Sequence, residues 1–129
     1  MIGIWSGGAQ QFLLVLAVST TLFFAIPIFF VPMRWAKLML WTIPGHTDLA
    51  VYFGRCLGAF VLMMELMMLR AGLNGTGIPM VFEIMTIIWV FMIVVHVWGW
   101  LAKIQPITET LEIGFWVLLL ALTLAFWPS

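Results

Sequence analysis

The chain has 129 residues, of which 65% are hydrophobic and 8% are charged, and its five basic and five acidic residues leave no net charge. An average soluble domain is about 45–50% apolar and about 25% charged. The composition therefore excludes an ordinary water-soluble domain, and the missing basic surface excludes a nucleic-acid-binding protein. The single cysteine, Cys56, excludes an internal disulfide and a cysteine-only metal site. The length fits one membrane domain, residues 1–129.

Four long apolar runs follow one another along the chain, at residues 11–31, 49–69, 78–102 and 107–127. Each reaches the ~20 residues that an α-helix needs to cross ~30 Å of hydrocarbon. Strands are excluded because apolar and polar residues do not alternate and four spans cannot close a barrel. The sequence therefore predicts an all-α, polytopic membrane protein built as a bundle of four transmembrane helices. Pro27 removes a backbone donor inside the first span, so we expect a kink there.

The segment 33–41, after the first span, alternates charged and bulky residues. Aromatic rings at headgroup level and snorkelling cations are typical of a short helix in the membrane interface. The residues that carry this pattern are Arg34, Trp35, Lys37 and Trp41.

Basic residues are more frequent in the first and third loops than on the opposite side of the membrane. Arg34, Lys37 and Lys103 lie in these loops, with Arg55 close by, whereas the opposite side has Arg70. The positive-inside rule then predicts that these loops are cytoplasmic and that both termini lie outside.

Two carboxyl groups are expected at similar depth in the outer half of the membrane. Glu65 and Glu83 lie about five residues, or ~7–8 Å, inside the outer ends of the second and third spans. If these helices are neighbours, the carboxyls meet, and two close carboxylates in a low dielectric do not both ionise easily. The pair is either a proton, cation or quinol-proton site, or a set of interhelical hydrogen bonds and subunit contacts. We favour the structural role.

A second polar group is predicted in the cytoplasmic half, where Arg55, His96 and Glu112 have similar depths. The spacing also places Asp48 and Tyr52 on the helix face of Arg55, and Glu109, Trp116 and Thr123 on that of Glu112. We expect a buried ion pair between Arg55 and Glu112, with His96 within hydrogen-bond reach. His96 has an alternative role as a ligand of a quinone or a pigment. No catalytic residue and no metal site are expected.

Small residues predict how the second span packs. Ala50, Gly54 and Gly58 recur every four residues, and Gly54 and Gly58 form a GxxxG motif. Such a strip lets two helix backbones approach closely in lipid. Glu65 follows Gly58 by seven residues and so lies on the same face.

Two stretches, WTIPGHTDLAVYFGRCLG at 41–58 and HVWGWLAKIQPITETLE at 96–112, resemble small bacterial four-helix membrane proteins of the DoxX-like group. Size and helix number agree over the whole chain, and Tyr52-Phe-Gly-Arg55 is the local similarity. The resemblance implies the inner membrane of a bacterium and a link to membrane redox chemistry. It assigns no functional residue.

The expected function is that of a non-catalytic accessory or stabilising subunit of a larger membrane complex, in electron transport or photosynthesis. The chain is almost entirely intramembrane and has no catalytic motif, so a self-contained enzyme is not expected. One alternative is a small redox or quinone-interacting membrane protein, and another is a small proton-coupled transporter. The expected ligands are a quinone, a pigment or lipid, and the expected partners are membrane lipids, other membrane subunits or further copies of the chain.

Overall fold

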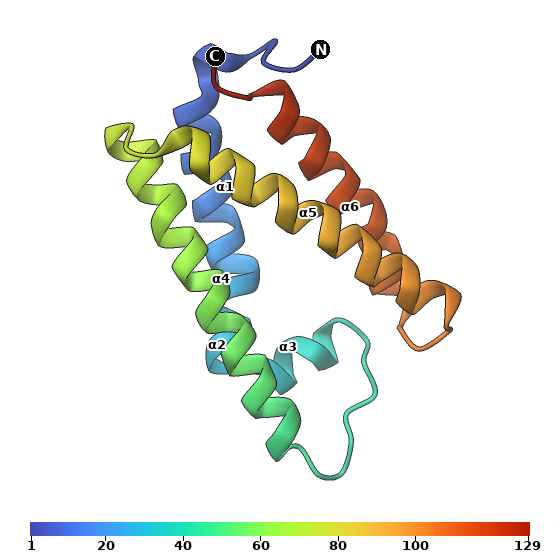
Figure 1. The fold of residues 1–129 in the computed structure, drawn as a ribbon. Helices are drawn as coiled ribbons and strands as arrows, with labels where there is room; N and C mark the ends of the chain where they lie inside the picture. The colour runs from blue at the N-terminus through green and yellow to red at the C-terminus, as the bar shows by residue number, and fades with distance from the viewer.

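The computed structural model describes all residues, 1–129, and is entirely helical outside its turns. Four helical segments are long and apolar enough to cross a membrane, which confirms the predicted architecture (Figure 1). They are Ser6–Phe30, α4 (Asp48–Asn74), α5 (Ile78–Leu101) and α6 (Ile107–Ala125). The first span begins about five residues earlier and α4 ends about five residues later than hydropathy alone predicts, because helix ends are not set by hydropathy.

The first span departs from regular α-helical geometry close to Pro27, where the sequence predicts a kink. It consists of α1 (Ala9–Thr20), a π-helical turn (Thr21–Ala25) and α2 (Ile26–Phe30). Pro27 has no N–H to donate to the carbonyl of Phe23, four residues before it. That carbonyl instead accepts a hydrogen bond from Trp35 Nε1 at 3.2 Å.

The short helix expected after the first span is α3 (Pro32–Leu38). It ends before Trp41, because Leu40 has a left-handed backbone with φ of 65°. The hydroxyl of Thr108 donates a hydrogen bond to the carbonyl of Met39. The segment after α3 is thereby fastened to the start of α6.

The helices are arranged as two pairs (Figure 1). The first span lies along α4, and α5 lies along α6. Both termini lie at one end of the bundle, whereas α3 lies toward the other. The backbone N–H groups of Gly3 and Trp5 donate to Leu124 and Ala125 at 2.9 Å, which ties the N-terminal segment to the end of α6.

The core joins the two pairs and is mainly apolar. Its largest fully buried side chains include Leu13, Met68, Phe82 and Met85, one or more from each of three spans. Most other large apolar side chains point outward, with exposed fractions such as 70% for Phe60. An apolar outer surface is what a bundle in lipid requires, since lipid tails solvate these side chains.

Candidate functional site

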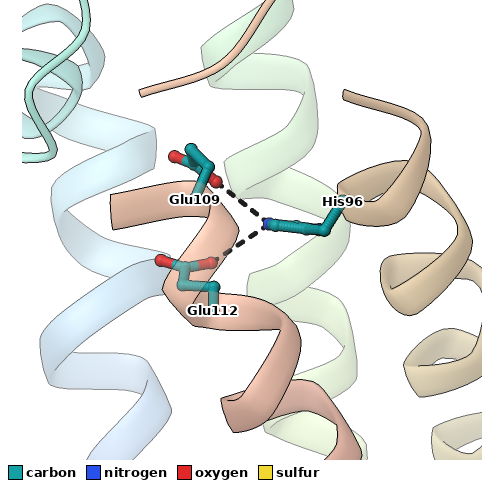
Figure 2. A group of neighbouring side chains, drawn as sticks. All are labelled: His96, Glu109 and Glu112. Atoms are coloured by element: carbon teal, nitrogen blue, oxygen red, sulfur yellow. Dashed lines mark hydrogen bonds and ion pairs between the residues drawn. The ribbon is translucent and has the colours of Figure 1, made fainter. Parts of the chain in front are cut away.

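The most concentrated polar group is a triad of His96, Glu109 and Glu112 between α5 and α6 (Figure 2). His96 Nε2 lies 3.0 Å from Glu109 Oε2 and 3.2 Å from Glu112 Oε2. Glu109 and Glu112 are three residues apart, so they project from one face of α6 toward α5. The three atoms that could bind a ligand lie within 4.8 Å of one another. We call these three residues the His–Glu–Glu triad.

The triad is buried, although it lies near the end of a span. The side chains of His96, Glu109 and Glu112 are 6%, 10% and 12% exposed. Both glutamates belong to the first two turns of α6, where the helix dipole favours negative charge. The beginning of α6 thus supplies two carboxylates in a place that water hardly reaches.

Both ring nitrogens of His96 have polar neighbours. Nδ1 lies 2.7 Å from the carbonyl oxygen of Met92, which only accepts, so Nδ1 carries a proton and is the donor. Nε2 is the target of the indole N–H of Trp116 at 3.3 Å. The same nitrogen lies at hydrogen-bond distance from one oxygen of each carboxylate, to which only an Nε2–H can donate. Nε2 is therefore the ring nitrogen that meets the indole and both carboxylates, as a donor when it carries a proton and as an acceptor when it does not.

Neighbouring side chains hold the triad in place. Trp41 Nε1 donates to Glu109 Oε1 at 2.8 Å. Gln105 Nε2 donates to the carbonyl of His96 at 2.9 Å and to Thr110 Oγ1 at 3.1 Å. This position of Gln105 requires Gly99, because a Cβ there would lie 2.0 Å from Gln105 Oε1. The orientation of His96 and Glu109 is thus set by residues outside the triad.

A cleft of about 300 Å³ opens beside the triad. His96, Gln105 and Glu109 provide its polar lining. Two tryptophans and three smaller residues complete the wall: Trp41, Val95, Trp98, Gly99 and Ile104. Val95 and Trp98 are 58% and 71% exposed on the outer face of α5, so the cleft is reached from the side of the bundle.

The predicted ion pair of Arg55 and Glu112 is wrong. Arg55 is exposed and forms no ion pair, and Glu112 pairs with His96. The reason is the helix arrangement, since α4 packs on the first span and not on α6. Tyr52 is 63% exposed, and the carboxylate of Asp48 lies 3.7 Å from His46 outside the cluster. Of the six residues predicted for this cluster, the structure joins only His96, Glu109 and Glu112.

The predicted carboxyl pair of Glu65 and Glu83 is also not formed. Glu65 is buried, with a 4% exposed fraction, whereas Glu83 is exposed. Position along a helix predicts depth in the membrane, but it does not predict the direction in which a side chain points. The hydroxyls of Thr20 and Thr21 in the first span, and not Glu83, face the Glu65 carboxyl.

Three residues of the site have roles that the sequence did not predict: Trp41, Gln105 and Trp116. Trp116 shares the helical stripe of Glu112, and this spacing is a usable signal. Trp41 and Gln105 lie in loops, where residue spacing does not predict contacts. The sequence predicts His96, Glu109 and Glu112 in one polar cluster, but not that their side chains form a set of the metal-ligand type.

Comparison with protein families, curated proteins and solved structures finds no match to this chain. The resemblance to the DoxX-like group therefore has no support beyond the shared size and number of spans. The function has to be argued from the geometry of the site.

Proposed function

We propose that this chain is an integral membrane protein that binds a divalent first-row transition-metal ion through His96, Glu109 and Glu112. The observation that carries the proposal is the orientation of His96. Its Nε2, the atom that binds a metal once it is deprotonated, faces two carboxylate oxygens at 3.0 and 3.2 Å, while its Nδ1 donates to a backbone carbonyl. Metal-binding histidines are commonly fixed by such a bond from their other nitrogen.

The distances within the triad suit a metal ion. Zinc-type ions bind histidine nitrogen and carboxylate oxygen at about 2.0–2.2 Å, so adjacent ligand atoms lie about 3.0–3.5 Å apart. The two distances from Nε2, which are also hydrogen-bond distances, fall in this range, and all three ligand atoms lie within 4.8 Å of one another. Trp41 bonds the oxygen of Glu109 that points away from His96, as an outer-shell partner of a metal ligand does.

The charge of the triad indicates which ion would bind. In the state that binds a metal, with His96 neutral and both glutamates ionised, the triad carries two negative charges, and no Lys or Arg forms an ion pair with it. A divalent cation neutralises this charge and takes the place of the proton on Nε2. Imidazole with carboxylates favours Mn²⁺, Fe²⁺ or Zn²⁺ over Cu⁺, which prefers sulfur. Three protein ligands leave a coordination position open for a further ligand.

The cleft supports a second candidate function, a small redox protein that binds a quinone. Its two tryptophans suit a planar ring, its opening on the outer face of α5 suits a lipid-soluble molecule, and the triad can exchange protons. Val95→Trp would fill the cleft and should abolish binding of a short-chain quinone, whereas Val94→Trp on the same outer face should not. Equal binding by both variants would remove this candidate. The role of an accessory subunit stays a prediction.

Metal titration of the purified protein tests the primary proposal. The protein in detergent is stripped with a chelator and titrated with Co²⁺, and visible absorption and metal content are measured. We expect one ion per chain and at least a hundredfold weaker binding by His96→Ala and Glu112→Gln. His46→Ala and Glu83→Gln change exposed residues of the same types and should bind as the wild type does. No stoichiometric uptake, or equal losses in the ligand and control variants, would overturn the proposal.

A further inference from the structure

Glu65 lies in a close-packed seam between α4 and the first span. Gly58, Glu65 and Gly72 follow one another at intervals of seven residues and share one face of α4. A Cβ at Gly58 would lie 2.6 Å from the backbone of Phe29, and one at Gly72 would lie 2.7 Å from Leu14. The two helices therefore approach closely at Gly58 and at Gly72. Between these two contacts, α4 places an ionisable residue, Glu65, against the first span.

The carboxyl of Glu65 meets hydroxyl oxygens that offer lone pairs. Gly58 meets Phe29 and Gly72 meets Leu14, so Glu65, midway between the two glycines, lies opposite the middle of the first span, where Thr20 and Thr21 are found. Thr20 already donates its hydroxyl proton to the carbonyl of Leu16 at 2.7 Å, so toward Glu65 it can only accept. Glu65 Oε2 and Thr21 Oγ1 are both inaccessible to solvent and have no hydrogen-bond partner. Thr21 Oγ1 and Glu65 Oε2 are thus two buried polar atoms that lack a partner at the contact between α4 and the first span.

No charged side chain neutralises Glu65. The span Ser6–Phe30 contains none, Arg70 is exposed, and the nearest other carboxyl of this half, Glu83, is exposed as well. Along α4, Glu65 is four residues from the midpoint, or about 6 Å from the middle of the span. A bare carboxylate at this depth is costly, so Glu65 requires a proton or another cation.

We propose that Glu65, Thr20 and Thr21 form a binding site for one small monovalent cation such as Na⁺, with a proton competing for the same carboxylate. The donor set consists of oxygen atoms alone, which favours a hard cation over a transition metal. One carboxylate carries one negative charge, so a monovalent ion leaves the site neutral and a divalent ion does not. A cation at this contact would supply the partner that Glu65 Oε2 and Thr21 Oγ1 lack.

The backbone of the first span supports this assignment. Thr21 is the first residue of the π-helical turn Thr21–Ala25, and single π-helical turns occur frequently at functional sites. The site shares no residue with the His–Glu–Glu triad. The two proposals can therefore be tested independently of each other.

Carbodiimide labelling tests the site directly. Dicyclohexylcarbodiimide is lipid-soluble, and a protonated carboxyl adds to it to form a stable N-acylurea, without oxidation or reduction. The protein in liposomes is labelled with and without NaCl, with choline chloride keeping the ionic strength constant, and the labelled glutamates are quantified by peptide mass spectrometry. Glu83, exposed and in the same half of the bundle, is the internal control.

We expect Glu65 to be labelled in choline chloride and to react at least tenfold more slowly at saturating Na⁺, while Glu83 reacts equally in both. Thr21→Val should lose the protection and Thr21→Ser should keep it. Equal labelling of Glu65 with and without Na⁺, Li⁺ or K⁺ in the wild type would overturn the proposal, whatever the variants do. So would a Glu65 that is never labelled where Glu83 is, because it would not exchange its proton.

Discussion

Replacing Trp41 with phenylalanine should weaken metal binding although Trp41 is not a ligand. Its indole N–H donates to Glu109 Oε1 at 2.8 Å, and Phe keeps an aromatic ring in the cleft while removing only this donor. Loss of an outer-shell partner typically costs 10–100-fold in metal affinity. Trp41 is 37% exposed, so water can partly replace the lost donor. We therefore expect the lower half of that range, about tenfold to thirtyfold or ~1.4–2 kcal/mol.

The assay is a competition titration of Co²⁺ between the protein and a chelator of known affinity. Trp98→Phe is the matched control, because Trp98 lines the same cleft but donates no hydrogen bond to the triad. Its dissociation constant should equal that of the wild type. The reasoning is refuted if Trp41→Phe binds Co²⁺ as tightly as the wild type, or if both tryptophan variants lose affinity equally.

Three further outcomes follow from the packing and from the triad. Gly58→Ala places a Cβ 2.6 Å from the backbone of Phe29 and should lower the free energy of unfolding in detergent by about 1–3 kcal/mol; Gly114→Ala enters open space and should cause no loss. Thr123→Val removes the acceptor of the 2.9 Å bond from Trp89 and should cost about 0.5–2 kcal/mol in the same assay; an unchanged stability would mean that the bond contributes nothing. Lowering the pH should weaken Co²⁺ binding, because protons compete for the imidazole and the carboxylates; an affinity independent of pH would exclude these ligands.

The sequence predicts the four spans and α3 because those signals are local. About twenty apolar residues are long enough to cross a membrane, whichever helices they pack against. Pro32 begins α3 directly after the first apolar run. The strip with Gly54 and Gly58 is also local, and the structure sets these glycines against Pro32 and Phe29.

The partners of the buried polar residues could not be predicted, because they depend on which helices are neighbours. Arg55 and Glu112 have similar depths, but α4 packs on the first span and turns Arg55 outward. Glu65 lies opposite Thr20 and Thr21, beside a π-helical turn that no hydropathy pattern reveals. Trp41 reaches Glu109 only because the segment after α3 folds back to α6.

X-ray absorption spectroscopy of the Zn²⁺-loaded protein is the most direct test of the His–Glu–Glu triad as a metal site. The account predicts a single imidazole with carboxylate oxygens in the first shell, at about 2.0–2.2 Å, and loss of the imidazole scattering in His96→Ala. A shell of oxygen alone, a sulfur ligand or two imidazoles in the wild type would contradict it.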